Sequence, residues 1–402
     1  MQISGDLSPK SIFSDRISDV PKSFIREILK VAIDPSVISF AGGLPNRKLF
    51  PVEEIKEATN RVLEEYGRDV LQYSNTEGFL ELRKYIAQRY LEKQNLDIPV
   101  DNILITNGSQ QGLDLLGKIL LNQGDEAVIE EPGYLGAIQA LSVYRASFRP
   151  VPVSEEGMAL ARLKAVMSQG APKLIYTVPN FQNPAGISYP EANRLGVADL
   201  LRNTPTLLIE DDPYGELQFE GEKKTSFKKL IPENTILLGS FSKTVVPSFR
   251  LGWLAAPDHI LEKLVIAKQA ADLHTNNFAQ HVIYRYIKDN NFDAHIEKIV
   301  SVYRSQRNAM IESIRHYFPQ EIKYTKPEGG MFLWVTLPPQ MSSMKLFEIA
   351  IQDKVAFVPG HPFYINKTEV NTLRLNFSCV DEETIQLGIK RLGRAIIQLP
   401  AA

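Results

Sequence analysis

The chain has 402 residues, of which 44% are hydrophobic and 23% charged, a balance typical of a soluble globular protein with a sizeable core. Lys and Arg number 45 against 47 Asp and Glu, so the net charge of -2 provides no basic surface for nucleic acid and no polybasic membrane anchor. The single cysteine, Cys379, excludes an intrachain disulfide and a cysteine-based zinc cluster. No apolar run reaches the roughly 20 residues that span a bilayer. We expect a cytoplasmic protein whose partners are small molecules, with no nucleic acid and no membrane among them.

The first fifty residues contain one predicted helix, in KSFIREILKVA, and a long loop, SFAGGLPNRKLFP. They offer too little apolar surface to fold alone. We expect residues 1–50 to pack on the C-terminal part of the chain and the active site, or on a partner subunit.

Residues 51–290 are predicted to form a large α/β domain. Short apolar runs that end in turn or polar residues alternate with segments of helical period, as in a mainly parallel sheet with helices on both faces. The runs are NILIT, DEAVIEE, KLIYTVP, TLLIEDD, NTILLGSFS and RLGWLAA. Ligands of such sheets bind outside the carboxyl ends of the strands, so chemistry is expected where these runs end.

The pattern of apolar residues changes after residue 290, and residues 291–402 are predicted to form a smaller α+β domain. A long helical stretch, IEKIVSVYRSQRNAMIESIRHYF, is followed by GGMFLWVTL, KLFEIAIQDKVAFVPG, TLRLNFSCV and a closing helical segment.

The first strand ends carry motifs that are individually weak. TNGSQQG opens a helix whose free N–H groups suit a phosphate, although Ser109 could equally be an ordinary N-cap. Tyr134 in EPGY could stack on a flat ring or be a core tyrosine. Asn183 in PNFQNPAG could donate to a phenolic oxygen, or the motif could be only a turn.

The next two strand ends are more informative. In LLIEDDPYGEL a carboxylate could hold a protonated pyridine nitrogen; metal binding by Glu210, Asp211 and Asp212 is disfavoured because adjacent strand residues point to opposite faces. In GSFSKTVVPSFRLGW, Lys243 fits a Schiff-base lysine whose pKa is lowered by burial beside cations, with a solvated loop lysine as the alternative. Arg250 could clamp a phosphate near it.

Together these motifs resemble the fold-type I pyridoxal-phosphate aminotransferases of class I/II over essentially the whole chain. The resemblance is carried by S-x-S-K-x(6)-R-x-G, N-P-x-G, D-x-x-Y and R-L-N-F. SFIREILK, ISFAGGLPN and LQYSNTEGFLELR are similar to the branch of 2-aminoadipate and kynurenine aminotransferases. MocR-type regulators share the signature but also carry an N-terminal winged-helix domain, which we do not expect in this protein.

The resemblance implies a role for each matching residue. Lys243 carries the cofactor and moves a proton, Asp211 pairs with the pyridine nitrogen, and Tyr134 stacks on the ring. Further cofactor contacts are implied for Asn183 and Tyr214 at the phenolic oxygen and for Ser109, Gln110, Ser240, Ser242, Arg250 and a neighbouring subunit's Tyr73 at the phosphate. No metal is implied.

The substrate side is less determined by the sequence. The resemblance implies that Arg374 binds the substrate α-carboxylate with Asn183 and the backbone of Gly43. Arg26 could meet a distal carboxylate, as 2-aminoadipate or glutamate would require, or be a helix-surface arginine. Leucine or aromatic donors, a 2-oxoglutarate acceptor and a homodimer are also expected, with a β-lyase, a decarboxylase or a cofactor-binding sensor as alternatives.

Overall fold

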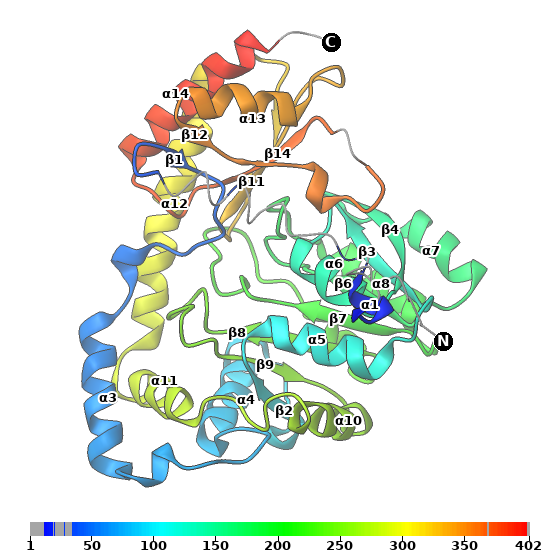
Figure 1. Ribbon diagram of the computed structural model, residues 1–402, viewed down its shortest axis with the longest axis vertical. Helices are drawn as coiled ribbons and strands as arrows, with labels where there is room; N and C mark the ends of the chain where they lie inside the picture. Colours follow the sequence, from blue (N-terminus) through cyan, green and yellow to red (C-terminus); the bar gives the residue numbers. More distant parts are fainter. Residues whose placement is uncertain (1–11, 19, 21–27, 29–33, 368–369, 400–402) are drawn as a thin grey trace, which may run out of the picture.

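The computed structural model describes residues 12–18, 20, 28, 34–367 and 370–399. Within that part of the chain, an eight-stranded sheet and a four-stranded sheet lie one above the other, and helix α12 (Phe292–Tyr317) runs between their levels (Figure 1). This is the expected mixed α/β architecture.

The eight-stranded sheet has the order β2-β9-β8-β7-β6-β3-β4-β5. Strands β3, β4, β6, β7 and β8 pair in parallel, whereas β9 runs antiparallel to both of its neighbours. The strands are β2 (Ile103–Thr106), β3 (Glu126–Glu131), β4 (Ser147–Ser154), β5 (Gly157–Met158), β6 (Leu174–Thr177), β7 (Leu207–Asp211), β8 (Thr235–Ser240) and β9 (Gly252–Ala255). Each of the six apolar runs contains one of these strands.

Helices cover both faces of this sheet because the strands are apolar on both sides. Leu104, Ile129 and Leu238 pack with α5 (Ser109–Leu120), α6 (Leu135–Ser142) and α10 (Asp258–Gln269). Val128 and Leu208 face α7 (Leu160–Gln169), α8 (Glu191–Leu201) and α9 (Phe227–Leu230). At the β2 edge, α3 (Val52–Tyr66), α4 (Leu80–Gln94) and α11 (Asn277–Asp289) cover this second face.

The four-stranded sheet is antiparallel, with the order β10-β11-β14-β13. Its strands are β10 (Lys323–Tyr324), β11 (Phe332–Thr336), β13 (Val358–Pro359) and β14 (Thr372–Asn376). Helices α12, α13 (Ser343–Gln352) and α14 (Glu382–Gln398) pack beside it, and α12 and α14 lie against each other.

Residues 38–42 are held against the C-terminal part of the chain. Strand β1 (Ile38–Ser39) pairs in parallel with β12 (Val355–Ala356), and the Asn376 amide donates to the carbonyl of Gly42 at 2.6 Å. Most of the predicted helix in KSFIREILKVA lies outside the described residues, whereas a four-residue helix, α1, covers Asp15–Ser18.

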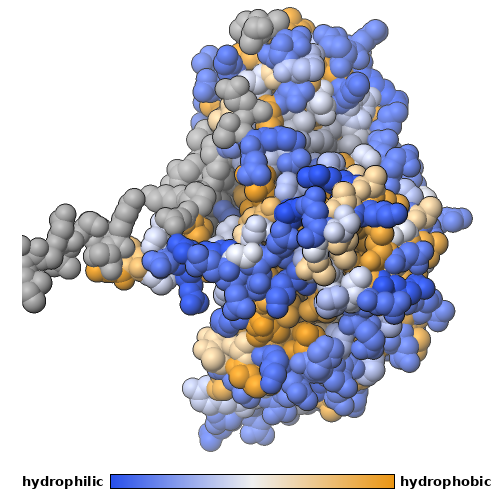
Figure 2. Space-filling model, turned by 90° about the vertical axis from the view of Figure 1, so that its right-hand side faces the viewer, coloured by the Kyte–Doolittle hydropathy of each residue, from blue (hydrophilic) through white to orange (hydrophobic). Residues whose placement is uncertain are grey.

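Figure 2 shows one face on which apolar residues form small patches between charged and polar ones. None of the described helices combines the length and the apolar character that crossing a bilayer requires.

Candidate active site

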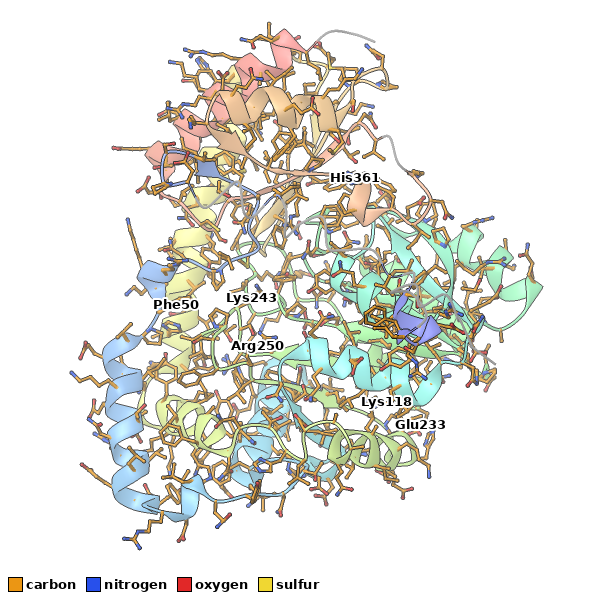
Figure 3. All side chains as sticks on the ribbon, in the orientation of Figure 1. Phe50, Lys118, Glu233, Lys243, Arg250 and His361 are labelled. Atoms are coloured by element: carbon orange, nitrogen blue, oxygen red, sulfur yellow. The ribbon has the colours of Figure 1, made fainter. Side chains whose placement is uncertain are left out.

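The carboxyl ends of β2, β3, β6, β7 and β8 surround an open cavity of about 1020 Å³. Of the predicted site residues that the structure describes, all but Tyr73 line it, and Val178 and Pro213 join them. The lining is Gly43, Ser109, Gln110, Tyr134, Val178, Asn183, Asp211, Pro213, Tyr214, Ser240, Ser242, Lys243, Arg250 and Arg374. Figure 3 shows Lys243 and Arg250 between the small sheet and α5. Residues distant in sequence meet here because parallel strands end at one edge of the sheet.

Lys243 follows β8 and its amine is held inside the cavity. Nζ donates to the carbonyl of Gly43 at 2.8 Å. Burial lowers the pKa of Lys243 to about 8; the Cys379 thiol opposes this shift, and the guanidinium groups of Arg374 and Arg250 add to it. The amine is therefore not that of a solvated loop lysine, and a larger fraction of it is neutral near pH 8 than for a free lysine.

The turn between β2 and α5 is shaped to receive an anion. Gly108, with φ 74°, holds the N-cap position and Ser109 is the first helical residue, so the interpretation of Ser109 as an N-cap is wrong. A Cβ on Gly108 would lie 2.5 Å from Nη2 of Arg250, which shows how closely that guanidinium approaches the turn. Ser240 and Ser242 lie nearby on the cavity wall, with 2.9 Å between their hydroxyl oxygens. First-turn N–H groups, hydroxyls and a guanidinium form a set that suits a phosphate.

Asp211 ends β7 with one oxygen bonded and the other free. Oδ2 accepts from the Tyr176 hydroxyl at 2.7 Å, whereas Oδ1 is buried without a partner among the described residues. Burial raises the pKa of Asp211 to about 7. A buried oxygen without a donor is costly, so this atom marks a place for a positively charged or N–H group.

The neighbouring acids point elsewhere. Glu210 accepts from the Ser226 hydroxyl at 2.6 Å and Asp212 from the Asn180 amide at 3.0 Å. The three carboxylates do not converge, and no cluster of metal-ligating side chains occurs among residues 34–367 and 370–399 or in the described N-terminal stretches.

Arg374, on β14, faces the cavity from the small sheet. Its Nη1 donates to Oδ1 of Asn183 and its Nη2 to the carbonyl of Ala41, both at 2.7 Å. Phe332 and Phe363 lie 4.4 and 5.3 Å from the guanidinium carbon. Burial lowers the pKa of Arg374 to about 10, and Nε has no partner in the described part of the chain. The residue is therefore a buried cation and not a solvent-facing charge.

Two phenols complete the wall of the cavity. The Tyr134 ring stacks on that of Tyr176, with 6.4 Å between centroids and 25° between planes. Burial raises the pKa of Tyr134 to about 12 and also raises that of Tyr214. Both phenols are therefore hydrogen-bond donors at neutral pH.

One predicted residue, Tyr73, lies apart from this cavity. Tyr73 is 79% exposed, contacts His274 edge-to-face at 5.8 Å and lines a separate surface pocket. Arg26 lies outside the described residues.

Sequence reasoning missed a buried carboxylate that supports the Asn183 loop. Glu130 accepts from the Tyr189 and Thr177 hydroxyls, the Val178 N–H and the Gln182 amide, at 2.6–2.9 Å. The only signal was an acid inside the buried run DEAVIEE.

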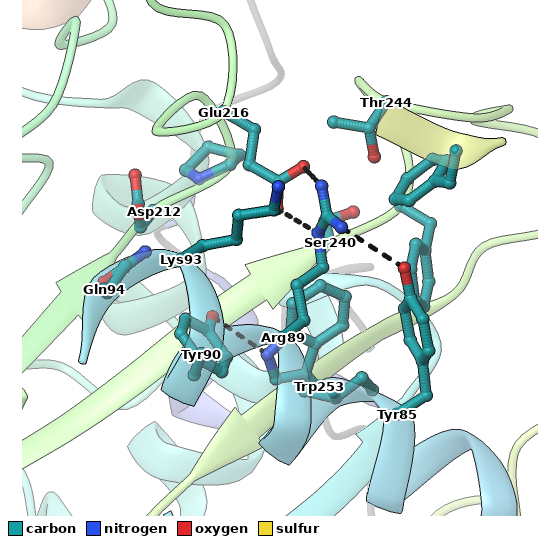
Figure 4. Close-up of a pocket in the computed structure, with 14 residues that line it drawn as sticks. Tyr85, Arg89, Tyr90, Lys93, Gln94, Asp212, Glu216, Ser240, Thr244 and Trp253 are labelled. Carbon is teal, nitrogen blue, oxygen red and sulfur yellow. Dashed lines mark hydrogen bonds and ion pairs between the residues drawn. The ribbon is translucent and has the colours of Figure 1, made fainter. Parts of the chain in front are cut away.

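A second support lies beside the loop after β7, in the pocket shown in Figure 4, which Arg89, Asp212 and Glu216 line. Arg89, on α4, donates to both carboxylate oxygens of Glu216 at 2.5 and 2.9 Å and to Asp293 at 2.9 Å. The guanidinium thus ties the Asp212–Glu216 loop to α4 and to the first turn of α12.

Known proteins resemble this chain over nearly its full length. The family model described as "Aminotransferase class I and II" matches residues 36–392. The aromatic-amino-acid aminotransferase 1 of Thermococcus litoralis is 41% identical, covering 97% of this chain and 95% of its own. The 2-aminoadipate transaminase of Thermus thermophilus is 40% identical, covering 97% and 98%.

A solved structure agrees with these matches. The α-aminoadipate aminotransferase of Thermus thermophilus, complexed with N-(5'-phosphopyridoxyl)-L-leucine, superimposes with a TM-score of 0.91 at 39% identity, covering 98% of this chain and 99% of that one. Family model, relatives and structure therefore place this chain among the class I and II aminotransferases, as an enzyme of fold type I that uses pyridoxal 5'-phosphate.

Proposed function

We propose that this aminotransferase moves the amino group of an L-α-amino acid of the 2-aminoadipate, glutamate, leucine or aromatic type to a 2-oxo acid, with 2-oxoglutarate as the acceptor. The first product leaves before the acceptor binds, in a ping-pong cycle. The relatives named for aromatic amino acids and 2-aminoadipate support this range. The observation that carries the proposal is that an amine of lowered pKa, a free carboxylate oxygen and a buried guanidinium line one cavity.

In this proposal the cavity residues bind the cofactor at four places. Asp211 holds the ring nitrogen with its free oxygen, Tyr134 covers one face of the ring, and Asn183 and Tyr214 contact the phenolic oxygen. The phosphate is held by Ser109, Gln110, Ser240, Ser242 and Arg250, and by Tyr73 of the partner subunit. Pyridoxal phosphate, when bound, supplies an aldehyde for the amine and a protonated ring that withdraws electrons from the substrate α-carbon.

Lys243 is proposed to bind the cofactor and then to move the proton that leaves the substrate Cα. A base serves best when its pKa lies near the working pH. The lowered pKa of about 8 supports this role.

Arg374 is proposed to bind the substrate α-carboxylate in a two-pronged contact, aided by Asn183 and the backbone of Gly43. Phe332 and Phe363 beside the guanidinium exclude water from that contact. Arg26 is proposed to select substrates that carry a second carboxylate.

At the level of the whole protein we propose a cytoplasmic homodimer. We also propose that each subunit consists of a large cofactor-binding domain at 51–290, a small domain at 291–402, and an N-terminal segment at 1–50 that packs over the small domain and the active site.

The proposal is tested by half-reactions. L-2-aminoadipate, glutamate, leucine, phenylalanine and kynurenine are added singly to the loaded enzyme without an oxo acid, and the visible absorbance of the bound cofactor is followed. We expect at least one amino acid to discharge that absorbance, 2-oxoglutarate to restore it, and Lys243→Ala to abolish both changes. If no amino acid discharges the absorbance, a lyase or a sensor accounts for the site better. Appreciable turnover by Lys243→Ala contradicts the role of that residue.

A further inference from the structure

Asp211 differs from the other buried acids at the strand ends in its number of donors. Glu130 accepts four hydrogen bonds and Glu210 accepts from Ser226 and from the N–H of Lys228. Asp211 accepts one, from Tyr176, although it is only 2% exposed. The orientation of its carboxylate is therefore set by a single side chain.

The register of the sheet explains why Tyr176 is that side chain. Tyr176 pairs with Ile209 of β7, and cross-strand partners point to the same face of a sheet. Asp211 follows Ile209 by two residues and so shares its face, whereas Glu210 and Thr177 point to the opposite one. Tyr176 is fully buried and its ring stacks on that of Tyr134. Its hydroxyl therefore has no access to water as an alternative hydrogen-bond partner to Asp211.

We propose that Tyr176 is a positioning residue for the ring-nitrogen site: its phenol occupies Oδ2 of Asp211 and thereby presents Oδ1 to the ring nitrogen as an ionised acceptor. The inference rests on the proposed role of Asp211. It assigns to Tyr176 a function for which the hydrogen bond is needed and the bulk of the ring is not.

The surroundings make the ionisation of Asp211 depend on this bond. The titratable groups on the cavity side of the carboxylate are Tyr176 and the phenols Tyr134 and Tyr214, and the cations Lys243, Arg250 and Arg374 line the same cavity. The acids Asp212 and Glu130 lie on the other face and act on Asp211 through their charge. Burial raises the pKa of Asp211 and the two acids raise it further, whereas the Tyr176 hydroxyl lowers it. Replacement of Tyr176 by Phe therefore raises the pKa of Asp211 above its value of about 7.

The expected signature is a pH-dependent loss of cofactor affinity. Below the pKa of Asp211 the free protein holds a neutral carboxyl, which must lose its proton to pair with a protonated ring nitrogen; above it, the carboxylate is already ionised. The hydrogen bond from Tyr176 lowers the free energy needed to ionise Asp211 at low pH. At high pH Asp211 is already ionised, so this bond does not change the affinity for the ligand. The probe is pyridoxamine phosphate, because it has the ring nitrogen but cannot link to Lys243.

The experiment measures the dissociation constant of pyridoxamine phosphate for the full chain freed of cofactor. For Tyr176→Phe relative to the unmodified protein, we expect binding roughly tenfold weaker near pH 6, with the ratio approaching one near pH 9. A 1-deaza analogue, which has no ring nitrogen, should show no such pH-dependent ratio. A ratio that is constant with pH, or equal for both ligands, assigns Tyr176 a merely structural role and overturns the proposal.

Two variants complete the test. Tyr189→Phe removes an equally buried phenol from Glu130, which keeps three other donors, and should leave the ratio near one at every pH. Asp211→Ala should weaken pyridoxamine phosphate binding but not binding of the 1-deaza analogue. If Asp211→Ala binds pyridoxamine phosphate as tightly as the unmodified protein does, the role proposed for Asp211 fails. If Asp211→Ala weakens that binding but Tyr176→Phe shows no pH-dependent loss, only the role proposed for Tyr176 fails.

Discussion

Lys243 lowers the free energy of unfolding of the cofactor-free protein at neutral pH. The reason is that its amine is held in the cavity with a pKa of about 8, against 10.5 for an ordinary lysine. At pH values between these two, the unfolded chain binds more protons than the folded chain, so the stability of the cofactor-free protein increases with pH in that range. The penalty is fully present below the folded pKa and disappears above the unfolded one.

We therefore expect Lys243→Met to stabilise the cofactor-free protein by roughly 2–3 kcal/mol at neutral pH, and this gain to disappear near pH 10.5. Denaturant unfolding of both proteins at about pH 7.5 and about pH 10 measures the difference. Lys268 provides a contrast. Burial lowers its pKa too, but its amine is paired with Asp272 at 2.8 Å, so Lys268→Met leaves that carboxylate without its cation and should destabilise the protein. A pH-independent difference for Lys243→Met would show that packing, not ionisation, separates the two proteins.

Residues such as Tyr176 and Glu130 show the limit of sequence reasoning at this scale. Lys243 and Asp211 could be singled out because each lies where an apolar run ends, at the place where ligands of parallel sheets bind, and Arg250 because it lies seven positions after Lys243. Tyr176 and Glu130 lie inside such runs and not at their ends, so their positions in the sequence do not mark them as site residues. Their contacts depend on which strands are neighbours and in what register, and a single strand does not specify either.

At the scale of the elements, strand β9 fixes the position of the turn between β2 and α5, which is the proposed phosphate site. It runs antiparallel to both of its neighbours, β2 and β8. Gly252 at its start approaches the turn so closely that a Cβ there would lie 2.8 Å from Gly108 Cα and from the N–H nitrogen of Ser109. Those atoms are backbone, which cannot move aside without displacing the turn itself.

Gly252→Ala is therefore expected to weaken binding of pyridoxamine phosphate about tenfold or more, while binding of pyridoxamine, which lacks the phosphate, changes little. Titration of both ligands gives the ratio. Gly112→Ala is the matched control, because its Cβ would meet a flexible Leu238 methyl at 3.2 Å and the turn need not move. Equal losses for both ligands would mean that the substitution perturbs the sheet as a whole.

The elements themselves could largely be predicted. The six apolar runs are strands and the long helical stretch after residue 290 is α12. Strand β4 was missed because only Val151 among its eight residues is buried and two of the others are prolines, so it has neither an apolar run nor strand-like composition. Such an outer strand is fixed by pairing with β3 and not by its own sequence.

For the whole molecule, the proposed dimer can be tested through Tyr73. This side chain is 79% exposed, and Leu71, two residues before it in the chain, is exposed at 68%. If Tyr73 serves the active site of a partner, a subunit that lacks Tyr73 and a subunit that lacks Lys243 can complement each other.

Tyr73→Ala and Lys243→Ala are each expected to have little activity under limiting cofactor, whereas a mixture refolded together should recover about one quarter of the wild-type activity, since half of random dimers are hybrids with one intact site. The steady-state rate of the mixture against those of the separate variants measures this. A mixture no more active than the average of its components would place Tyr73 outside the partner's site.

The pairing of β1 with β12 has a consequence for synthesis. Residues 38 and 39 leave the ribosome early but find their partner strand only when Val355 and Ala356 have followed. The positions from Ser109 to Arg250 are complete long before then, so a growing chain can assemble the cofactor platform first. Arg374, which bonds to Ala41 beside β1, is fixed last. With the roles proposed above, the nascent protein therefore acquires its cofactor-binding residues before the residue that binds the substrate carboxylate.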